Sequence, residues 1–232
     1  FAERLVTSLL TSEQIEYFKL ENDIDLVVAF DSGHRFRVNM MMHKDGIAGT
    51  YRIVPRTVSS LESLGFSVER SETIKKMLSY HNGLVLVTGP VGSGKTTTLA
   101  ALVDEMNRNR SDHIICVEET IEIVYSSAQC SVTQRGVGSH TSTFHSALKG
   151  ALRQDPDIIV IGEMRDLETI EMAISASETG HLVIGTMHTS DASNTLNRLL
   201  DVFPPAQQSQ IRAMVAESLK GIICQRLLPS TN

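Results

Sequence analysis

The 232-residue chain is 41% hydrophobic and 21% charged, the composition of a globular protein long enough to bury one or two cores. Its net charge of -6 argues against a dedicated nucleic-acid-binding protein, so we expect no direct nucleic-acid partner. No apolar run approaches the roughly 18 residues of a transmembrane helix, and no signal-peptide pattern is present, so we expect no transmembrane segment.

The first 58 residues predict a small α+β unit that is separate from the rest of the chain. One helix and then three strands are expected, over residues 11–20, 25–30, 34–40 and 47–54. Ser12 is the expected cap of the helix, and Asp31-Ser32-Gly33 predicts a hairpin turn. Arg35 and Arg37 alternate with apolar residues and therefore share one face of the sheet, while Arg52 lies on the third strand. Arginines in such a pattern ordinarily form a solvated face.

Residues 59–82 predict a linker and a leading helix, and residues 83–232 predict a larger domain in which strands and helices alternate. The leading helix is expected over residues 71–80, ended by Asn82-Gly83. The expected strands cover residues 84–87, 114–118, 158–161, 182–187 and, at an edge, 221–227. The expected helices cover residues 97–106, 144–153, 167–178, 192–200 and 207–219. This alternation favours an α/β fold class with a doubly wound parallel sheet.

A glycine-rich loop joins the first expected strand of the larger domain to its first helix. The loop comprises Gly89, Pro90, Val91, Gly92, Ser93, Gly94, Lys95 and Thr96, with Thr97 next, and matches G-x-x-x-x-G-K-[ST] at every fixed position. Glycines let the backbone N–H groups point inward at phosphate oxygens, and the helix N-terminus adds its dipole. The sequence therefore predicts a triphosphate held by Lys95, with Mg²⁺ bound to the Thr96 hydroxyl.

Acidic residues and one histidine follow the other expected strands. In a doubly wound sheet the ligand binds at the carboxyl ends of the strands, where Glu118-Glu119, Glu163 and His188 lie. Glu163 closes an apolar strand and is expected to hold Mg²⁺ directly or through water. Glu122 is a candidate base for the attacking water, and His188 is placed to contact the γ-phosphate or Glu163. Each glutamate taken alone is equally well read as a solvated loop carboxylate, and their joint placement favours a site.

Four motifs in this order resemble the secretion ATPases of the type II secretion and type IV pilus superfamily. They are the phosphate-binding loop, residues 117–122 (Val-Glu-Glu-Thr-Ile-Glu), residues 152–166 and residues 178–188. Residues 35–39 and 201–204 favour the pilus retraction branch of this family. The resemblance implies a cytoplasmic homohexamer, peripheral at the inner membrane, that hydrolyses ATP with Mg²⁺ and acts on inner-membrane pilus platform proteins. Pilus retraction and twitching motility are the implied function.

The resemblance also implies a domain organisation and roles for individual residues. Residues 1–58 are expected to be part of a PAS-like domain, and residues 83–232 a RecA-like ATPase core. The implied catalytic residues are Glu122 as general base, Glu163 as the Walker B acid, His188 in the His box, and Arg37 and Arg52 as arginine fingers. Glu119-Thr120 replaces the usual Asp-Pro, which keeps the acid but loses the rigid proline. Because the chain begins with Phe1 and stops shortly after Leu228, we expect it to be a fragment.

Three alternative functions remain open at this point. Pilus-extension and type II secretion motors usually carry a tetracysteine zinc insertion, and this chain contains no C-x-x-C sequence. A weakly hydrolysing nucleotide-binding scaffold is the second alternative, and the presence of both Glu122 and Glu163 argues against it. A nucleic-acid motor of the RecA type is the third, and the acidic balance and missing basic stripe argue against it.

Overall fold

The computed structural model describes residues 2–55 and 57–228 and divides the chain into two compact units. The first unit is Phe1–Thr57 together with Thr120–Ile123, and the second is Val58–Glu119 with Val124–Asn232. Across the described residues, no helix combines the length and the apolar character needed to cross a membrane.

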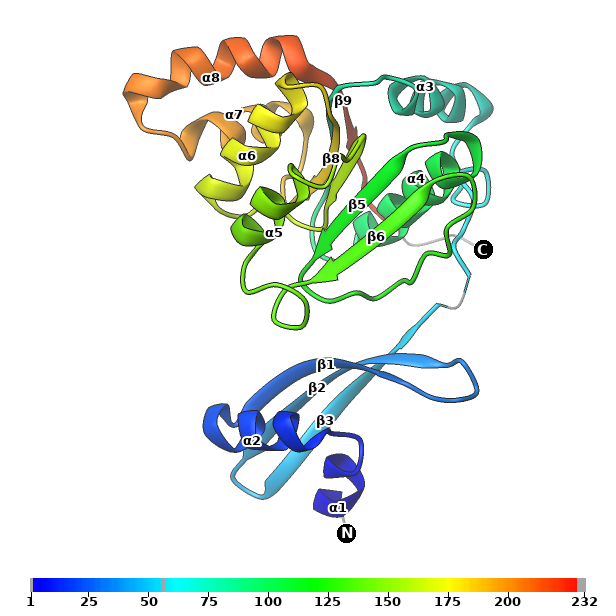
Figure 1. The fold of residues 1–232 in the computed structure, drawn as a ribbon, viewed down its shortest axis with the longest axis vertical. Helices are drawn as coiled ribbons and strands as arrows, with labels where there is room; N and C mark the ends of the chain where they lie inside the picture. Colours follow the sequence, from blue (N-terminus) through cyan, green and yellow to red (C-terminus); the bar gives the residue numbers. More distant parts are fainter. Residues whose placement is uncertain (1, 56, 229–232) are drawn as a thin grey trace. The chain divides into compact units, whose positions relative to one another are not determined.

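The first unit contains a three-stranded antiparallel sheet and two helices (Figure 1). Its elements are α1 (Ala2–Thr7), α2 (Ser12–Glu21), β1 (Asp23–Ala29), β2 (Arg35–His43) and β3 (Gly46–Val54). Phe18 on α2 packs against Val38 and Met40 on β2 to form the core of the unit. The expected turn after β1 is confirmed, because the Gly33 N–H donates to the Phe30 carbonyl at 2.7 Å.

Two features of this unit differ from the sequence-based expectation. The short helix α1 was not predicted. Ser12 is not the cap of α2: the Thr11 hydroxyl accepts from the Gln14 N–H, and the Gln14 side chain accepts from the Thr11 N–H in return. This reciprocal capping satisfies two backbone donors at once, which a cap at Ser12 would not do.

The second unit is built on a six-stranded sheet in which every ladder is parallel. From edge to edge the strands are β6 (Ser131–Gly136), β5 (His113–Glu118), β7 (Ile158–Ile161), β8 (Leu182–Met187), β4 (Gly83–Thr88) and β9 (Leu219–Cys224). The helices are α3 (Val68–Leu78), α4 (Lys95–Asn109), α5 (Phe144–Ala151), α6 (Leu167–Glu178), α7 (Ala192–Asp201) and α8 (Pro205–Ser218). The predicted α/β class with a doubly wound parallel sheet is confirmed.

The sheet is covered by helices on both faces (Figure 1). Leu84 and Leu86 of β4 pack in one core with residues of α5, α6, α7 and α8. Val85 and Val87 of the same strand point the other way, into a core shared with α3 and α4. Alternate side chains of a strand reach opposite faces, so a sheet buried on both sides requires the continuous apolar runs seen in the sequence.

Several element boundaries in this unit correct the sequence-based prediction. Helix α3 ends at Leu78 and not at residue 80, and Gly83 opens β4 instead of ending that helix. Helix α4 begins at Lys95, two residues earlier than expected, so the helix starts inside the phosphate-loop motif. Strand β6 was missed because its sequence is polar and its side chains are only half-buried at the sheet edge.

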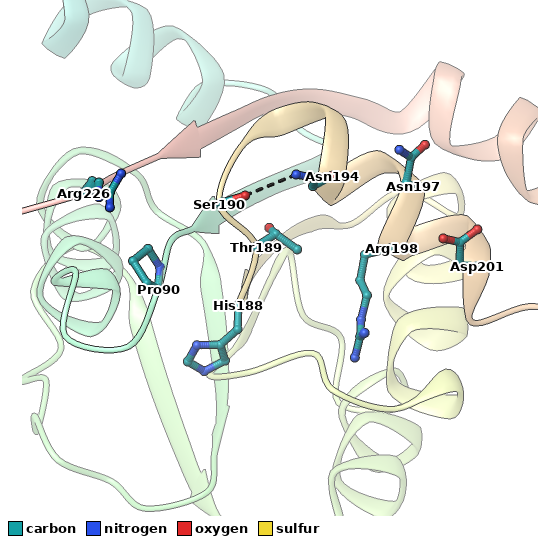
Figure 2. A pocket seen from close by; sticks show the side chains of 9 residues that line it. All are labelled: Pro90, His188, Thr189, Ser190, Asn194, Asn197, Arg198, Asp201 and Arg226. Atoms are coloured by element: carbon teal, nitrogen blue, oxygen red, sulfur yellow. Dashed lines mark hydrogen bonds between the residues drawn. The ribbon is translucent and has the colours of Figure 1, made fainter.

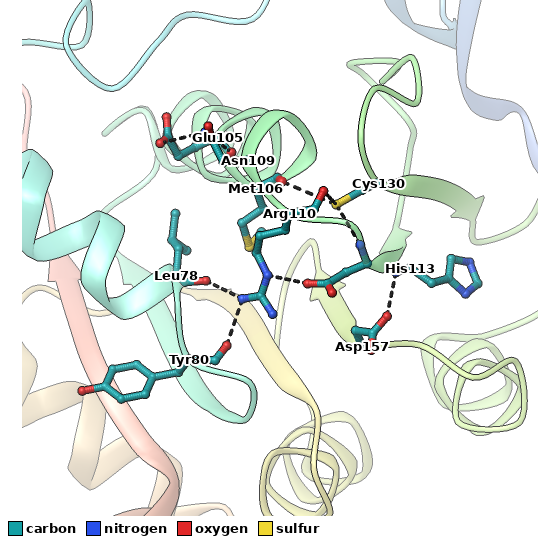
Figure 3. A network of polar contacts seen from close by, with 10 residues as sticks. Leu78, Tyr80, Glu105, Met106, Asn109, Arg110, His113, Cys130 and Asp157 are labelled. Atoms are coloured by element: carbon teal, nitrogen blue, oxygen red, sulfur yellow. Dashed lines mark hydrogen bonds and ion pairs between the residues drawn. The ribbon is translucent and has the colours of Figure 1, made fainter.

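A polar network fixes α4 at the end far from the glycine-rich loop (Figure 3). Arg110, the residue after α4, donates through Nη1 to the carbonyls of Leu78 and Tyr80 and through Nε to the Asp112 carboxylate. The Cys130 thiol donates to the Arg110 carbonyl at 3.1 Å. These bonds join the end of α3, the end of α4 and the start of β5, and so hold the helix that carries Lys95 against the sheet.

Candidate active site

Residues 89–94, the part of the glycine-rich loop that precedes α4, connect the carboxyl end of β4 to the N-terminus of that helix. Gly94 is the N-cap of α4 with φ 88°, and as a glycine it makes no side-chain capping hydrogen bond to the first turn of the helix. Such a backbone conformation strongly favours glycine, and it leaves N–H groups of the first helical turn available to an anion. Loop and helix terminus together therefore fit a phosphate group, as the sequence predicted.

Lys95 is held over the loop from the first turn of α4. Its Nζ donates to the Gly89 carbonyl at 2.9 Å and to the Pro90 carbonyl at 3.0 Å. Burial lowers the pKa of this ammonium group, and the nearby charge of Glu163 acts in the opposite direction. The side chain of Lys95 is therefore at the inner edge of the loop, where an anionic ligand would restore the solvation it has lost.

His188 links Lys95 to Glu163. The Nζ of Lys95 lies 3.2 Å from His188 Nδ1, and His188 Nε2 lies 2.8 Å from a carboxylate oxygen of Glu163. A lysine ammonium can only donate, so Nδ1 is the acceptor and Nε2 carries the proton that it donates to Glu163. One neutral tautomer of His188 thus satisfies both contacts. The expected contact between His188 and Glu163 is confirmed.

Arg165 completes this array and was not predicted from the sequence. Its guanidinium grips both oxygens of Glu163, with Nε at 2.6 Å and Nη2 at 2.7 Å, and reaches the Glu119 carboxylate at 3.3 Å. Burial tends to raise the pKa of Glu163, but the Arg165 bonds and His188 outweigh it, so the pKa is lowered. The carboxylate is therefore ionised at neutral pH. The only local signal for Arg165 was its place two residues after Glu163.

The ends of β7 and β8 are shaped so that Glu163 turns toward His188. The Thr186 hydroxyl donates to the Gly162 carbonyl at 2.6 Å, and the Met164 N–H donates to the Thr186 carbonyl at 2.9 Å. A Cβ atom at Gly185 would lie 2.3 Å from the Met164 sulfur, so glycine here leaves room for the Met164 side chain over β8. These contacts turn the chain immediately after β7 and place Glu163 between Arg165 and His188.

A pocket of about 700 Å³ lies beside His188 at the start of α7. Its lining residues are Pro90, His188, Thr189, Ser190, Asn194, Asn197, Arg198, Asp201 and Arg226 (Figure 2). Arg198 on α7 and Arg226 after β9 supply positive charge, and Asn194 donates to the Ser190 hydroxyl at 3.2 Å. Because Pro90 and His188 belong to both, this pocket is continuous with the loop site.

Glu122 and Arg37 meet within the first unit, which includes residues 120–123. Arg37 Nη1 lies 2.7 Å from a carboxylate oxygen of Glu122. Arg35 donates to the backbone carbonyls of Glu122 at 3.1 Å and Ile121 at 3.2 Å, so this short segment is held by two arginines of β2. Arg52 is exposed and lies directly opposite Arg37 on β3. The expectation that Arg35 and Arg37 share a sheet face is consistent with these contacts.

Metal binding by protein groups alone finds no support in the described part of the chain, where no three His, Cys, Asp or Glu residues are arranged to hold an ion. Thr96 is exposed at the start of α4, and Glu163 is half-buried. Mg²⁺ is commonly held by one or two protein groups together with phosphate oxygens, so this donor set fits a nucleotide-dependent magnesium site.

Comparisons with known proteins agree with the fold and the motifs. The family model described as "Type II/IV secretion system protein" matches residues 8–231. The chain is 43% identical over 224 residues to the type IV pilus retraction ATPase PilT of Pseudomonas aeruginosa, covering 97% of this chain and 64% of that protein. It is 42% identical to a twitching motility protein of Neisseria gonorrhoeae, covering 97% of this chain and 59% of that protein.

The solved structures give the same relationship. A crystal structure of the pilus retraction motor PilT with bound ADP matches with a TM-score of 0.94 at 40% identity, covering 99% of this chain and 66% of that one. The ATPase DotB of Legionella pneumophila matches with a TM-score of 0.83 at 29% identity, covering 98% of this chain and 64% of that one. This chain thus spans less than two thirds of the length of the curated relatives named above. It belongs to the type II/IV secretion system protein family.

Proposed function

We propose that this chain is the nucleotide-hydrolysing part of a hexameric ATPase motor that drives type IV pilus retraction and twitching motility. The observation that carries the proposal is the connected array Lys95–His188–Glu163 beside the uncapped N-terminus of α4. A lysine at the N-terminus of α4, together with a neutral histidine and an ionised carboxylate at the ends of parallel strands, forms a site suited to phosphoryl transfer. Similarity to pilus retraction ATPases, one of them solved with bound ADP, supports ATP as the nucleotide.

In this proposal residues 89–97 bind the phosphates of ATP. The inward N–H groups of the loop and of the N-terminus of α4 hold the β-phosphate, and Lys95 pairs with the β- and γ-phosphate oxygens. The two carbonyls that now accept from Lys95 keep its ammonium close to that position. His188 contacts both Lys95 and Glu163, so a γ-phosphate that binds Lys95 would act on His188 and Glu163 through these contacts.

Thr96 and Glu163 would hold Mg²⁺, which when bound neutralises charge developing on the phosphate oxygens. Arg165 keeps Glu163 ionised and fixed in direction, because it grips both carboxylate oxygens. Glu122 acts as the general base that takes a proton from the attacking water. Arg37 orients the Glu122 carboxylate through their 2.7 Å contact.

Arg37 and Arg52 are also proposed to act as arginine fingers on a nucleotide held by a neighbouring subunit. The two arginines lie opposite each other on β2 and β3. Like charges at directly opposite positions repel each other. Glu122 forms its ion pair with Arg37 and so offsets the charge of that arginine. A phosphate held by a neighbouring subunit is an anion that would satisfy Arg52. The ring of six copies, its place at the cytoplasmic face of the inner membrane and its action on pilus platform proteins belong to the proposal through the similarity to pilus retraction ATPases.

Retraction is preferred over extension or secretion because the sequence has three cysteines, none in a C-x-x-C arrangement that a zinc insertion requires. Steady-state ATP turnover measured against Mg²⁺ concentration tests the proposal against a nucleotide-binding scaffold. We expect Mg²⁺-dependent turnover, and we expect Glu163→Gln to lower it and to shift its Mg²⁺ dependence to higher concentrations. The control Glu171→Gln, on the exposed face of α6, should behave as the unaltered protein. Absence of turnover with intact nucleotide binding would favour the scaffold.

A further inference from the structure

Gln225, the residue after β9, binds the glycine-rich loop at both of its ends. Its backbone N–H donates to the carbonyl of Thr88, the last residue of β4, at 2.9 Å. Its side-chain Nε2 donates to the carbonyl of Ser93, near the end of the loop, at 2.8 Å. A single residue directly after the edge strand therefore spans the loop from the place where it leaves the sheet to the place where it enters α4.

The loop also packs directly on Gln225. A Cβ atom at Gly89 would lie 2.4 Å from the Gln225 carbonyl oxygen, and one at Gly94 would lie 3.2 Å from Gln225 Nε2. The first distance is far below van der Waals contact, so glycine at position 89 is needed for this approach in addition to its φ of 155°. The sequence of the loop and the position of Gln225 are thus coupled.

The direction of the Ser93 carbonyl determines the direction of the next N–H group. In a trans peptide the C=O of one residue and the N–H of the next point in opposite directions. Gln225 holds the Ser93 carbonyl toward the β9 side, so the Gly94 N–H points away from Gln225. Within the described part of the chain the other amide atom of Gln225, Oε1, has no hydrogen-bond partner, so the Nε2 bond to Ser93 is what orients this side chain.

We propose that Gln225 is a positioning residue for the phosphate-binding loop, and that it sets the inward direction of the Gly94 N–H through its bond to Ser93. The inference rests on the proposed function, in which this loop binds the phosphates of ATP. Because the phosphates of ADP and ATP meet the same N–H group, the effect of Gln225 is on ground-state binding. It therefore alters the affinity for both nucleotides and not the rate of the chemical step.

The test replaces Gln225 by Met, which keeps the length of the side chain and removes the donor. We expect the Kd for ADP, measured by titration calorimetry, and the KM for ATP to rise together by about threefold to tenfold, with kcat within twofold of the unaltered protein. Gln208→Met is the matched control. Gln208 lies on α8, away from the loop, and its Nε2 also donates to a backbone carbonyl, that of Phe203, at 3.1 Å. Gln225→Glu, of the same shape but without a donor, is the second variant and should raise the Kd for ADP at least as much.

Hydrogen exchange of the loop without nucleotide provides a readout that does not depend on activity. Amides of residues 92–96 should exchange faster in Gln225→Met than in the unaltered protein, while Gln208→Met leaves them unchanged. If the Gln225 variants keep the Kd for ADP within twofold and the loop exchange unchanged, the positioning role is wrong. A fall in melting temperature without a change in affinity would likewise overturn it. Failure of the unaltered protein to bind ADP would instead contradict the proposed function.

Discussion

The variant Glu122→Gln tests whether Glu122 is a catalytic base or only the partner of Arg37 in a structural ion pair. The two roles predict effects of very different size on turnover and on the free energy of unfolding. The Arg37–Glu122 contact is 2.7 Å long, but the two side chains are 36% and 25% exposed, so solvent screens the pair. Such a pair contributes at most about 1 kcal/mol to the free energy of unfolding, which corresponds to a melting-temperature change of roughly 2–4 °C. The amide of glutamine retains the shape and can still accept a hydrogen bond from Arg37.

A general base contributes much more to the reaction than this pair contributes to stability. If Glu122 removes the proton from the attacking water, Glu122→Gln should lower turnover by about 10²–10⁴-fold, or about 3–5 kcal/mol in the activation barrier. Nucleotide affinity should change little, because the carboxylate is not part of the phosphate-binding loop.

The assay measures phosphate release, ADP affinity by calorimetry and thermal unfolding on the same preparations. Glu62→Gln is the matched control, since Glu62 forms an ion pair with Lys75 at 3.1 Å on the surface of the second unit. That variant should lose neither turnover nor nucleotide affinity. If Glu122→Gln retains turnover within threefold of the unaltered protein, the assignment of Glu122 as base is wrong, and its pairing with Arg37 is purely structural.

Three further predictions follow from other contacts. Subunits carrying Arg52→Lys should bind ATP but hydrolyse it slowly, and mixing them with Glu122→Gln subunits should restore turnover. If native mass spectrometry shows mixed oligomers but turnover does not recover, Arg52 does not act across subunits. Arg165→Met should raise the pKa of Glu163, because the Arg165 guanidinium is the main group that lowers it in the unaltered protein. In a plot of turnover against pH, the loss of activity on the acid side should then begin at a higher pH, and an unchanged plot would contradict this. Arg110→Met should lower the free energy of unfolding by about 2–3 kcal/mol and Tm by roughly 5–10 °C, without changing ADP affinity at 25 °C. An unchanged Tm in calorimetry would show that the three hydrogen bonds of Arg110 do not stabilise the fold.

The sequence was most informative where a structure depends on local pattern. Strand β8 and helix α6 have the predicted bounds, because a fully apolar run and a capped amphipathic segment are each defined by adjacent residues. Strand β6 was not predicted because it forms by pairing with β5, and its polar sequence shows no alternation of apolar and polar residues. Helix α4 starts earlier than predicted because Gly94 provides a left-handed N-cap, which composition alone does not reveal.

Some residues of the candidate site were predicted from the sequence and others were not, for the same physical reason. The rule that ligands bind at the carboxyl ends of parallel strands predicts that Glu163 and His188 lie close together, and their 2.8 Å contact confirms it. Gln225 was missed because its contact with Ser93 joins residues 132 positions apart and has no local sequence signal. Arg165 was missed because its place two residues after Glu163 does not by itself show that its side chain turns back onto that carboxylate. Nor does the sequence contain any local mark of the pairing between Arg37 and Glu122, which lie 85 residues apart along the chain.

Nucleotide affinity after Lys95→Ala is the measurement that bears most directly on the central claim that residues 89–97 bind and hydrolyse ATP. Removing the ammonium deletes charge-assisted bonds to the phosphates and also the bonds to the Gly89 and Pro90 carbonyls. Titration calorimetry should show ADP and ATP affinity weakened by about tenfold to a hundredfold, with turnover abolished, while Lys149→Ala on α5 leaves both unchanged. Unaltered affinity and turnover in a folded Lys95→Ala protein would contradict the assignment of this loop as the nucleotide site.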